Sequence, residues 1–122
     1  MKEIIFVGAG GGIGAIFRYF ITKIDNALFH VGIPVGTLTE NVLGGFLIGV
    51  VYQISMSTDS ISPNLKLFLT TGLLGGFTTF STFSYETVTL FNEGKYMLSI
   101  INIVLNVVLS LIGAAIGIYI CK

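Results

Sequence analysis

The residues best suited to chemistry lie between Thr78 and Thr87, where hydroxyl and phenyl side chains are interleaved. A small hydrated anion that sheds its water needs replacement hydrogen-bond donors, and hydroxyl groups supply them without binding too tightly for release. The electropositive edges of Phe80 and Phe83 could also face an anion. The alternative interpretation is structural, because Ser and Thr in membrane helices often bond only to their own backbone. The hydroxyl residues of this stretch, which holds no lysine or arginine, are Thr78, Thr79, Ser81, Thr82, Ser84 and Thr87.

The pair Gly75-Gly76 comes shortly before this stretch, close to the middle of its apolar segment. Adjacent glycines followed by hydroxyl residues are a place where a helix can break. A break inside the hydrocarbon leaves backbone carbonyls without partners, and each such group is costly there. Broken membrane helices commonly direct these carbonyls at a cation. We therefore expect the helix of this segment to be broken near the membrane midplane.

Two polar residues, Glu40 and Asn41, interrupt the apolar stretch GTLTENVLGGFLIG. The Asn41 amide has both donors and acceptors, so it either lines a polar path or bonds one helix to another. A carboxylate inside a membrane is costly, whereas at the interface it is ordinary. The depth of Glu40 therefore decides whether it is a functional candidate.

Further polar residues lie in the first and last apolar segments. Arg18 and Tyr19 are expected to end the first helix, where the arginine either anchors the helix at the interface or captures anions in a vestibule. In the last segment, Asn102, Asn106 and Ser110 recur at every fourth residue and so share one helix face. We expect this stripe to face protein or a water-filled path.

Long apolar segments must position these residues. Only 10% of the residues are charged and 53% are hydrophobic, whereas a soluble domain averages about 25% charged residues. A helix needs roughly 20 apolar residues to cross the hydrocarbon core. We predict an all-α membrane protein in which residues 1–122 form a single domain of four transmembrane helices. The segments run from about Ile4 to Thr22, Pro34 to Ser55, Leu67 to Tyr85 (continuing to about Phe91) and Met97 to Ile120, joined by short connectors at 23–26, 57–64 and 92–95.

The first segment contains GGGIGA, which fits the glycine pattern of a dinucleotide-binding loop. That fold needs alternating strands and helices around a parallel sheet, and no such alternation follows here. The glycines instead form small-xxx-small pairs, which let membrane helices approach closely. Pairs with this spacing are Gly8/Gly12, Gly10/Gly14, Gly45/Gly49, Gly72/Gly76 and Gly113/Gly117.

The basic residues divide equally between the two sides of the predicted bundle. One side carries Lys2, Lys66 and Lys122, and the other carries Arg18, Lys23 and Lys95. Membrane orientation follows an excess of Lys and Arg on the cytoplasmic side, so this tie leaves the orientation undecided. Either the few charges make the count uninformative, or the chain inserts both ways and forms an antiparallel, dual-topology homodimer. The net charge of +0 creates no basic field that would attract nucleic acid.

Over essentially its whole length the sequence resembles the small fluoride channels of the Fluc (CrcB) family. The resemblance rests on GGGIGAIFRY in the first segment, GTLTENVLGGFLIG in the second and GLLGGFTTFSTFSYE in the third, of which the last is very specific. It implies a multi-pass protein of the bacterial inner membrane, an antiparallel homodimer with two pores through which toxic fluoride leaves the cell passively. One departure is Glu40, where the family more often has an apolar residue.

The resemblance also implies roles for single residues. Backbone carbonyls of Gly75 and Thr78 from both subunits would hold a central structural Na+. Two phenylalanines would face across from the other subunit, beside a pore-lining amide and a track of hydroxyl groups. The residues that match this fluoride path are Asn41, Phe80, Phe83, Ser81, Thr82 and Ser110, with Arg18 in the vestibule.

Two other classes of membrane protein remain as alternatives. A four-helix, proton-coupled multidrug exporter needs a membrane-embedded carboxylate in its first helix, where this chain has only Glu3 at the very start. Glu40 could take that part only if it lay deep in the membrane. A non-transporting scaffold would use the polar residues for packing alone. No nucleotide-binding motif, nucleophile with a paired base or cofactor motif points to an enzyme.

Overall fold

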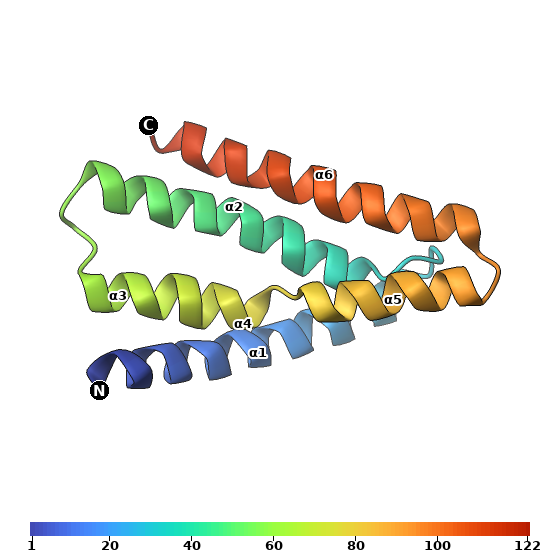
Figure 1. Ribbon diagram of the computed structural model, residues 1–122, viewed down its shortest axis with the longest axis horizontal. Coiled ribbons are helices and arrows are strands. Elements are labelled where there is room, and N and C mark those ends of the chain that lie inside the picture. The colour runs from blue at the N-terminus through green and yellow to red at the C-terminus, as the bar shows by residue number, and fades with distance from the viewer.

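The computed structural model describes residues 1–122 as helices that run back and forth along one axis (Figure 1). Three of them are continuous: α1 (Lys2–Leu28), α2 (Val35–Ser57) and α6 (Tyr96–Ile120). Each of these three is long and apolar enough to cross a membrane. The N- and C-termini lie at the same end of the bundle (Figure 1).

The third helical pass is interrupted, as the sequence predicted. A continuous helical arm, which includes a π-helical stretch, is followed by a short extended segment and then by a second helix that continues in the same direction (Figure 1). The pieces are α3 (Pro63–Leu67), η1 (Phe68–Leu74), α4 (Gly75–Phe77) and α5 (Phe80–Asn92). The chain therefore has four helical passes, three continuous and one broken.

Helix α1 extends further than its hydropathy indicates. The stretch 23–26, predicted to be a connector, is helical, and α1 ends only at Leu28, after which Phe29 adopts an extended backbone. Arg18 therefore lies inside α1, and the expectation that it ends the helix was wrong. A fall in hydropathy marks the edge of the hydrocarbon core, whereas hydrogen bonds within the backbone let a helix continue beyond that edge.

Glycines bring α2 and α6 into close contact along their length. A Cβ atom on Gly45 would lie 2.7 Å from the carbonyl oxygen of Ser110, and one on Gly113 would lie 3.0 Å from that of Val42. No side chain larger than hydrogen fits at such distances without moving a backbone. The predicted pairs Gly45/Gly49 and Gly113/Gly117 therefore do form the contact between these two helices.

Close backbone contacts at glycines also join α1 to the third pass. A Cβ atom on Gly10 would lie 2.5 Å from the carbonyl oxygen of Phe68, and one on Gly76 would overlap the backbone of Gly11. The opposite face of α1 is different, because a Cβ on Gly8 or Gly12 would have nothing within 4 Å. Of the two predicted faces on α1, only the Gly10/Gly14 face packs against another helix of the chain.

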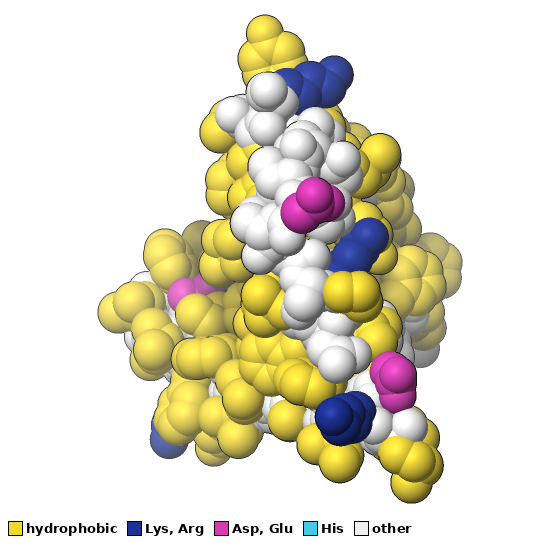
Figure 2. Space-filling view, turned by 90° about the vertical axis from the view of Figure 1, so that its left-hand side faces the viewer, with side chains coloured by type: hydrophobic (Ala, Val, Ile, Leu, Met, Phe, Trp, Pro, Cys, Tyr) yellow, Lys and Arg dark blue, Asp and Glu magenta, His cyan; other side chains and the backbone are white.

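Charged side chains lie mainly at the two ends of the bundle. Figure 2 views the end that carries both termini and the α2–α3 connection, where acidic and basic side chains are scattered among other polar atoms and hydrophobic side chains cover the flanks. Lys2, Lys66 and Lys122 belong to this end, whereas Lys23 and Lys95 belong to the opposite one. Arg18, which lies in the interior of α1 and bonds to the Gly76 carbonyl, belongs to neither end, so the fold leaves three basic side chains at one end and two at the other.

We expect Gly10→Ala to lower the stability of the folded protein by about 1–3 kcal/mol, because the added methyl group overlaps the backbone of η1. The measurement is thermal unfolding of the purified protein in detergent. Gly12→Ala is the matched control: it lies on the open face of the same helix, where alanine gains about 1 kcal/mol of helix propensity over glycine. Equal destabilisation by both substitutions would contradict close packing at Gly10.

Candidate functional site

The break between α4 and α5 consists of Thr78 and Thr79. Both have extended backbones, with φ −89° and ψ 160° at Thr78 and φ −153° and ψ 124° at Thr79. Gly75 and Gly76, the predicted breaking point, remain helical because Gly76 must pack against α1. The break was predicted in the right region, but β-branched threonines, which favour extended backbone, form it.

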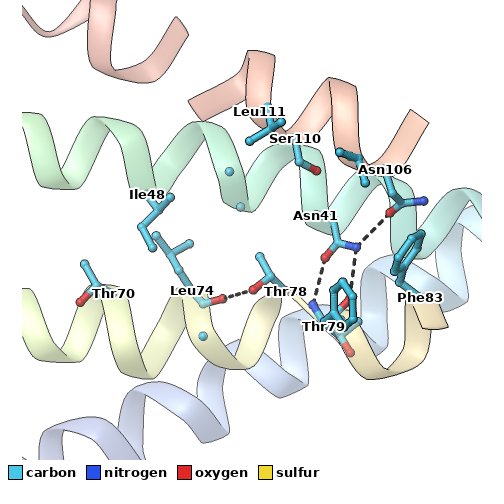
Figure 3. A pocket seen from close by; sticks show the side chains of 15 residues that line it. Asn41, Ile48, Thr70, Leu74, Thr78, Thr79, Phe83, Asn106, Ser110 and Leu111 are labelled. Atoms are coloured by element: carbon cyan, nitrogen blue, oxygen red, sulfur yellow. Dashed lines mark hydrogen bonds between the residues drawn. The ribbon is translucent and has the colours of Figure 1, made fainter. Parts of the chain in front are cut away.

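Asn41 of α2 bridges this break. Its Oδ1 accepts a hydrogen bond from the Thr79 N–H at 2.9 Å, and its Nδ2 donates to the Thr79 carbonyl at 3.2 Å and to Asn106 Oδ1 at 3.0 Å (Figure 3). The side-chain amide thus pairs with both backbone groups of one residue, as a neighbouring strand would. The bond to Oδ1 replaces the one that the Thr79 N–H would make to the Gly75 carbonyl in an unbroken helix.

Two more groups satisfy the ends of the broken helix. The Nε of Arg18 donates to the Gly76 carbonyl at 3.0 Å, where an unbroken helix would use the N–H of Phe80. The Thr79 hydroxyl accepts from the Thr82 N–H at 3.1 Å and so caps the start of α5. Arg18 therefore reaches from the interior of α1 to the last turn of α4.

A cavity of about 420 Å³ lies beside the break, between α2, α6 and the third pass. Its lining includes six of the residues predicted from the sequence but no Lys, Arg, His, Asp or Glu. The six are Asn41, Gly75, Thr78, Phe80, Phe83 and Ser110. Side chains that extend into this region from α2, α6 and the third pass are drawn in Figure 3.

The remaining predicted residues lie outside the cavity lining. Ser81 is exposed, with its hydroxyl 3.3 Å from that of Thr79, and Thr82 is half-buried on the next position of α5. Arg18 is half-buried between α1 and α4. The structure therefore places these three around the break but not in the cavity wall.

The two phenylalanines of the cavity differ in exposure. Their ring centroids are 5.4 Å apart and the rings are tilted by 57°. Phe83 is 8% exposed, whereas Phe80 is 77% exposed on the surface of the single chain. Phe80 thus stands at the open side of the cavity and Phe83 belongs to its wall.

Several hydroxyl groups of the predicted track donate hydrogen bonds to the backbone of their own helix. These groups follow the alternative, structural interpretation given for the sequence. Thr78, Ser84 and Thr87 each donate to the carbonyl four residues earlier, at 3.0, 2.9 and 2.7 Å. By contrast, the Oγ of Ser110 is buried and has no hydrogen-bond partner in the protein. The hydroxyl groups left to face an ion are therefore fewer than the sequence pattern suggested.

Two further residues of the site were singled out in the sequence only as members of the hydroxyl track and of the polar stripe. Thr79 and Asn106 both line the cavity and both bond to Asn41. The spacing of Asn102, Asn106 and Ser110 on one face of α6 was the signal for Asn106. Nothing in the sequence indicated that the backbone of Thr79 would be the partner.

Glu40 is buried next to the site but does not line the cavity. It lies in the second turn of α2, it is 1% exposed, and the hydroxyl of Thr22 on α1 donates a hydrogen bond to its carboxylate. On α5, Glu86 is half-buried, and its Oε1 has no hydrogen-bond partner in the protein. Glu40 is thus shielded by α1 instead of facing water at the interface.

Comparison with known proteins identifies the family. The family model described as "CrcB-like protein, Camphor Resistance (CrcB)" matches residues 5–118. The chain belongs to the CrcB family. This membership makes it a multi-pass membrane protein and not an enzyme, as the sequence predicted.

Several relatives of this CrcB-family chain carry the name "Fluoride-specific ion channel FluC". The protein of Ruminiclostridium cellulolyticum is 50% identical over 117 residues, which cover 96% of this chain and 90% of the relative. That of Clostridium novyi is 49% identical, with coverage of 93% and 88%. That of Campylobacter jejuni is 45% identical over 122 residues, with coverage of 100% and 99%.

We expect Arg18→Met to destabilise this CrcB-family chain by about 1–3 kcal/mol, because the Gly76 carbonyl then lacks its donor in the protein interior. Thermal unfolding in detergent measures the effect. Lys23→Met is the control, since Lys23 is exposed on the same helix and its Nζ lies only over the Tyr19 ring, 6.0 Å from the centroid. A loss at position 23 as large as that at position 18 would contradict a specific role of the Arg18 bond.

Proposed function

We propose that the protein is a fluoride-selective ion channel that exports cytoplasmic fluoride passively and so lowers its toxicity. The observation that carries this proposal is the cavity beside the helix break, which joins amide, hydroxyl and phenyl groups without any ionisable side chain. An anion that must pass quickly needs donors that replace its water, here the unpartnered Ser110 hydroxyl and the phenyl ring edges, but no fixed cation that would hold it. The names of relatives that are 45–50% identical support the choice of fluoride.

The proposed path follows the cavity and the adjacent face of α5. Asn41, Phe83 and Ser110 form its wall, and the unpartnered hydroxyl of Ser110 can turn toward an ion. Phe80 presents its ring at the open side. The row of hydroxyls continues along α5 with Ser81 and Thr82, and Arg18 supplies the cation of the vestibule.

The proposed assembly is an antiparallel, dual-topology homodimer with two pores. The nearly equal numbers of basic residues at the two ends of the bundle, three and two, give no strong orientation bias and so favour insertion in both orientations. Phe80, which is 77% exposed on the single chain, would then face a pore across the interface together with Phe83. Four passes alone are few to enclose a path, and a second copy would close the open side of the cavity.

We further propose a structural Na+ at the dimer centre, held by the carbonyls of Gly75 and Thr78. The geometry of the break fits this role. The Thr79 N–H, which would donate to Gly75 in an unbroken helix, donates to Asn41, and the Thr82 N–H, which would donate to Thr78, donates to the Thr79 hydroxyl. Both carbonyls are therefore released from their usual helical partners, and carbonyl oxygens suit a hard cation.

No chemical reaction is needed for this function. Fluoride enters cells as the neutral acid, ionises at cytoplasmic pH and is then trapped as the anion. A passive pore lets the anion leave down its gradient and the membrane potential. The chain's own residues only replace water around the ion and exclude larger or more tightly bound anions.

The decisive experiment is fluoride efflux from liposomes that contain the purified protein, read with a fluoride electrode and compared with chloride efflux. We expect rapid loss of fluoride with chloride retained. Phe80→Ile should slow fluoride efflux at least about tenfold, since a ring edge facing the ion is lost. Phe91→Ile, on an exposed part of α5 outside the cavity, is the matched control and should conduct like the natural protein.

Glu40→Gln separates the channel from the proton-coupled exporter in the same assay. The channel proposal expects transport to survive, because Glu40 is buried against Thr22 and does not line the cavity. An exporter that used Glu40 as its proton-binding carboxylate would lose transport. Fluoride retained by a folded, sodium-loaded protein would overturn the channel proposal.

Na+ should stabilise the protein specifically. A ligand that binds only the folded state raises stability by about 1.4 kcal/mol for each tenfold excess over its dissociation constant. We expect a higher thermal midpoint in NaCl than in KCl or choline chloride at equal ionic strength. Equal midpoints in the three salts would contradict the cation site while leaving fluoride conduction to be judged by efflux.

A further inference from the structure

A continuous row of hydrogen-bonded side chains connects Asn41 to the far half of α5. Asn41 Nδ2 donates to Asn106 Oδ1 at 3.0 Å, and Asn106 Nδ2 donates to Asn102 Oδ1 at 3.1 Å. Asn102 Nδ2 donates to the Thr87 hydroxyl at 2.9 Å, and that hydroxyl donates to the Phe83 carbonyl at 2.7 Å. We call these four side chains, Asn41, Asn106, Asn102 and Thr87, the amide ladder.

The amide ladder is shielded from its surroundings over most of its length. Asn102 is 0% exposed, Asn106 is 5% exposed and Thr87 is 9% exposed. A buried amide that turned over would place donor against donor and acceptor against acceptor, with no water to compensate. The orientation of each amide is therefore tied to that of its neighbours.

The direction of the ladder is set at both ends by the backbone. The Phe83 carbonyl can only accept, so the single hydrogen of the Thr87 hydroxyl is used there and Thr87 must accept from Asn102. A second carbonyl, that of Asn102, accepts from Asn106 Nδ2 at 2.9 Å and fixes the same direction. Asn106 must then present its oxygen to Asn41.

At the other end, the Thr79 N–H can only donate and therefore requires the oxygen of Asn41. Asn41 has two N–H hydrogens, and its Nδ2 serves the Thr79 carbonyl and Asn106 Oδ1. Both hydrogens are thus bound within the protein. Asn41 therefore contributes to the cavity by fixing the position of the break, and it has no hydrogen left to donate to an ion.

We propose that Thr87, Asn102 and Asn106 are positioning residues, which act through Asn41 to set the helix break and with it the placement of Phe80. This inference rests on the proposed channel function and deepens it. The residues of the polar stripe on α6 then have two different roles. Asn102 and Asn106 orient Asn41 at the break, whereas Ser110, which has no hydrogen-bond partner in the protein, faces the proposed path. Removal of the Thr87 hydroxyl should therefore weaken the hydrogen bonds between Asn41 and Thr79, although no hydrogen bond joins Thr87 and Thr79 directly.

Thr87→Val tests the proposal, because it removes the hydroxyl and keeps the branched shape. We measure hydrogen–deuterium exchange of the backbone amides around Thr79 by mass spectrometry on the full-length protein in liposomes. Exchange at the break should rise about tenfold as the Thr79 N–H loses a firmly oriented acceptor. Thr87→Ser, which restores the hydroxyl, should return exchange to that of the natural protein.

Thr89→Val is the matched control. Thr89 lies on the same helix and makes the same kind of bond, from its hydroxyl to the Tyr85 carbonyl at 2.7 Å, but it is outside the ladder. It should change neither exchange at Thr79 nor fluoride efflux. Thr87→Ala, a stronger helix former, gives the same test if the valine variant fails to fold.

Two outcomes overturn the proposal. One is unchanged exchange at Thr79 in a folded Thr87→Val or Thr87→Ala protein, and the other is a rise confined to the contact between α5 and α6. Fluoride efflux by the same variants should fall about tenfold together with the rise in exchange. Because exchange at Thr79 is measured without fluoride, a failure of the ladder is distinguishable from a failure of the channel function.

Discussion

Backbone groups released by the break between α4 and α5 must find new partners inside the membrane, and the rest of the structure depends on this requirement. Asn41 accepts from the N–H of Thr79, Arg18 donates to the carbonyl of Gly76, and the Thr79 hydroxyl accepts from the N–H of Thr82. These partners come from α1, α2 and the break itself. One interrupted helix therefore ties together elements that are far apart in the sequence.

Close packing at the glycines brings the helices near enough for the hydrogen bonds at the break to form. Gly76 lies against the backbone of Gly11, which brings α1 near enough for Arg18 to reach α4. Gly44 leaves room for the Thr78 methyl group, which brings α2 near enough for Asn41 to reach Thr79. Larger side chains at these glycines would separate the helices and leave the backbone of the break without partners.

The placement of charge complements the proposed passage of an anion. Ionisable side chains are absent from the cavity lining, and the nearby Glu40 is buried and bonded to Thr22 on the side of α1. Neutral donors such as the Ser110 hydroxyl can replace the water of a small ion without trapping it. The buried amides contribute orientation rather than charge, since each is held by neighbours whose own donors and acceptors are fixed.

The sequence by itself determined the helical class, the number of passes and the region of the break, because hydropathy, glycine spacing and runs of hydroxyl residues are local properties. It also singled out Asn41, Phe80, Phe83 and Ser110, which the structure gathers around one cavity. Only the tertiary structure decided that the threonines form the break, that α1 continues to Leu28, and that Asn41 pairs with the backbone of Thr79. These features depend on distances between helices that are remote in the chain, and on backbone groups that every residue carries and no side-chain pattern marks.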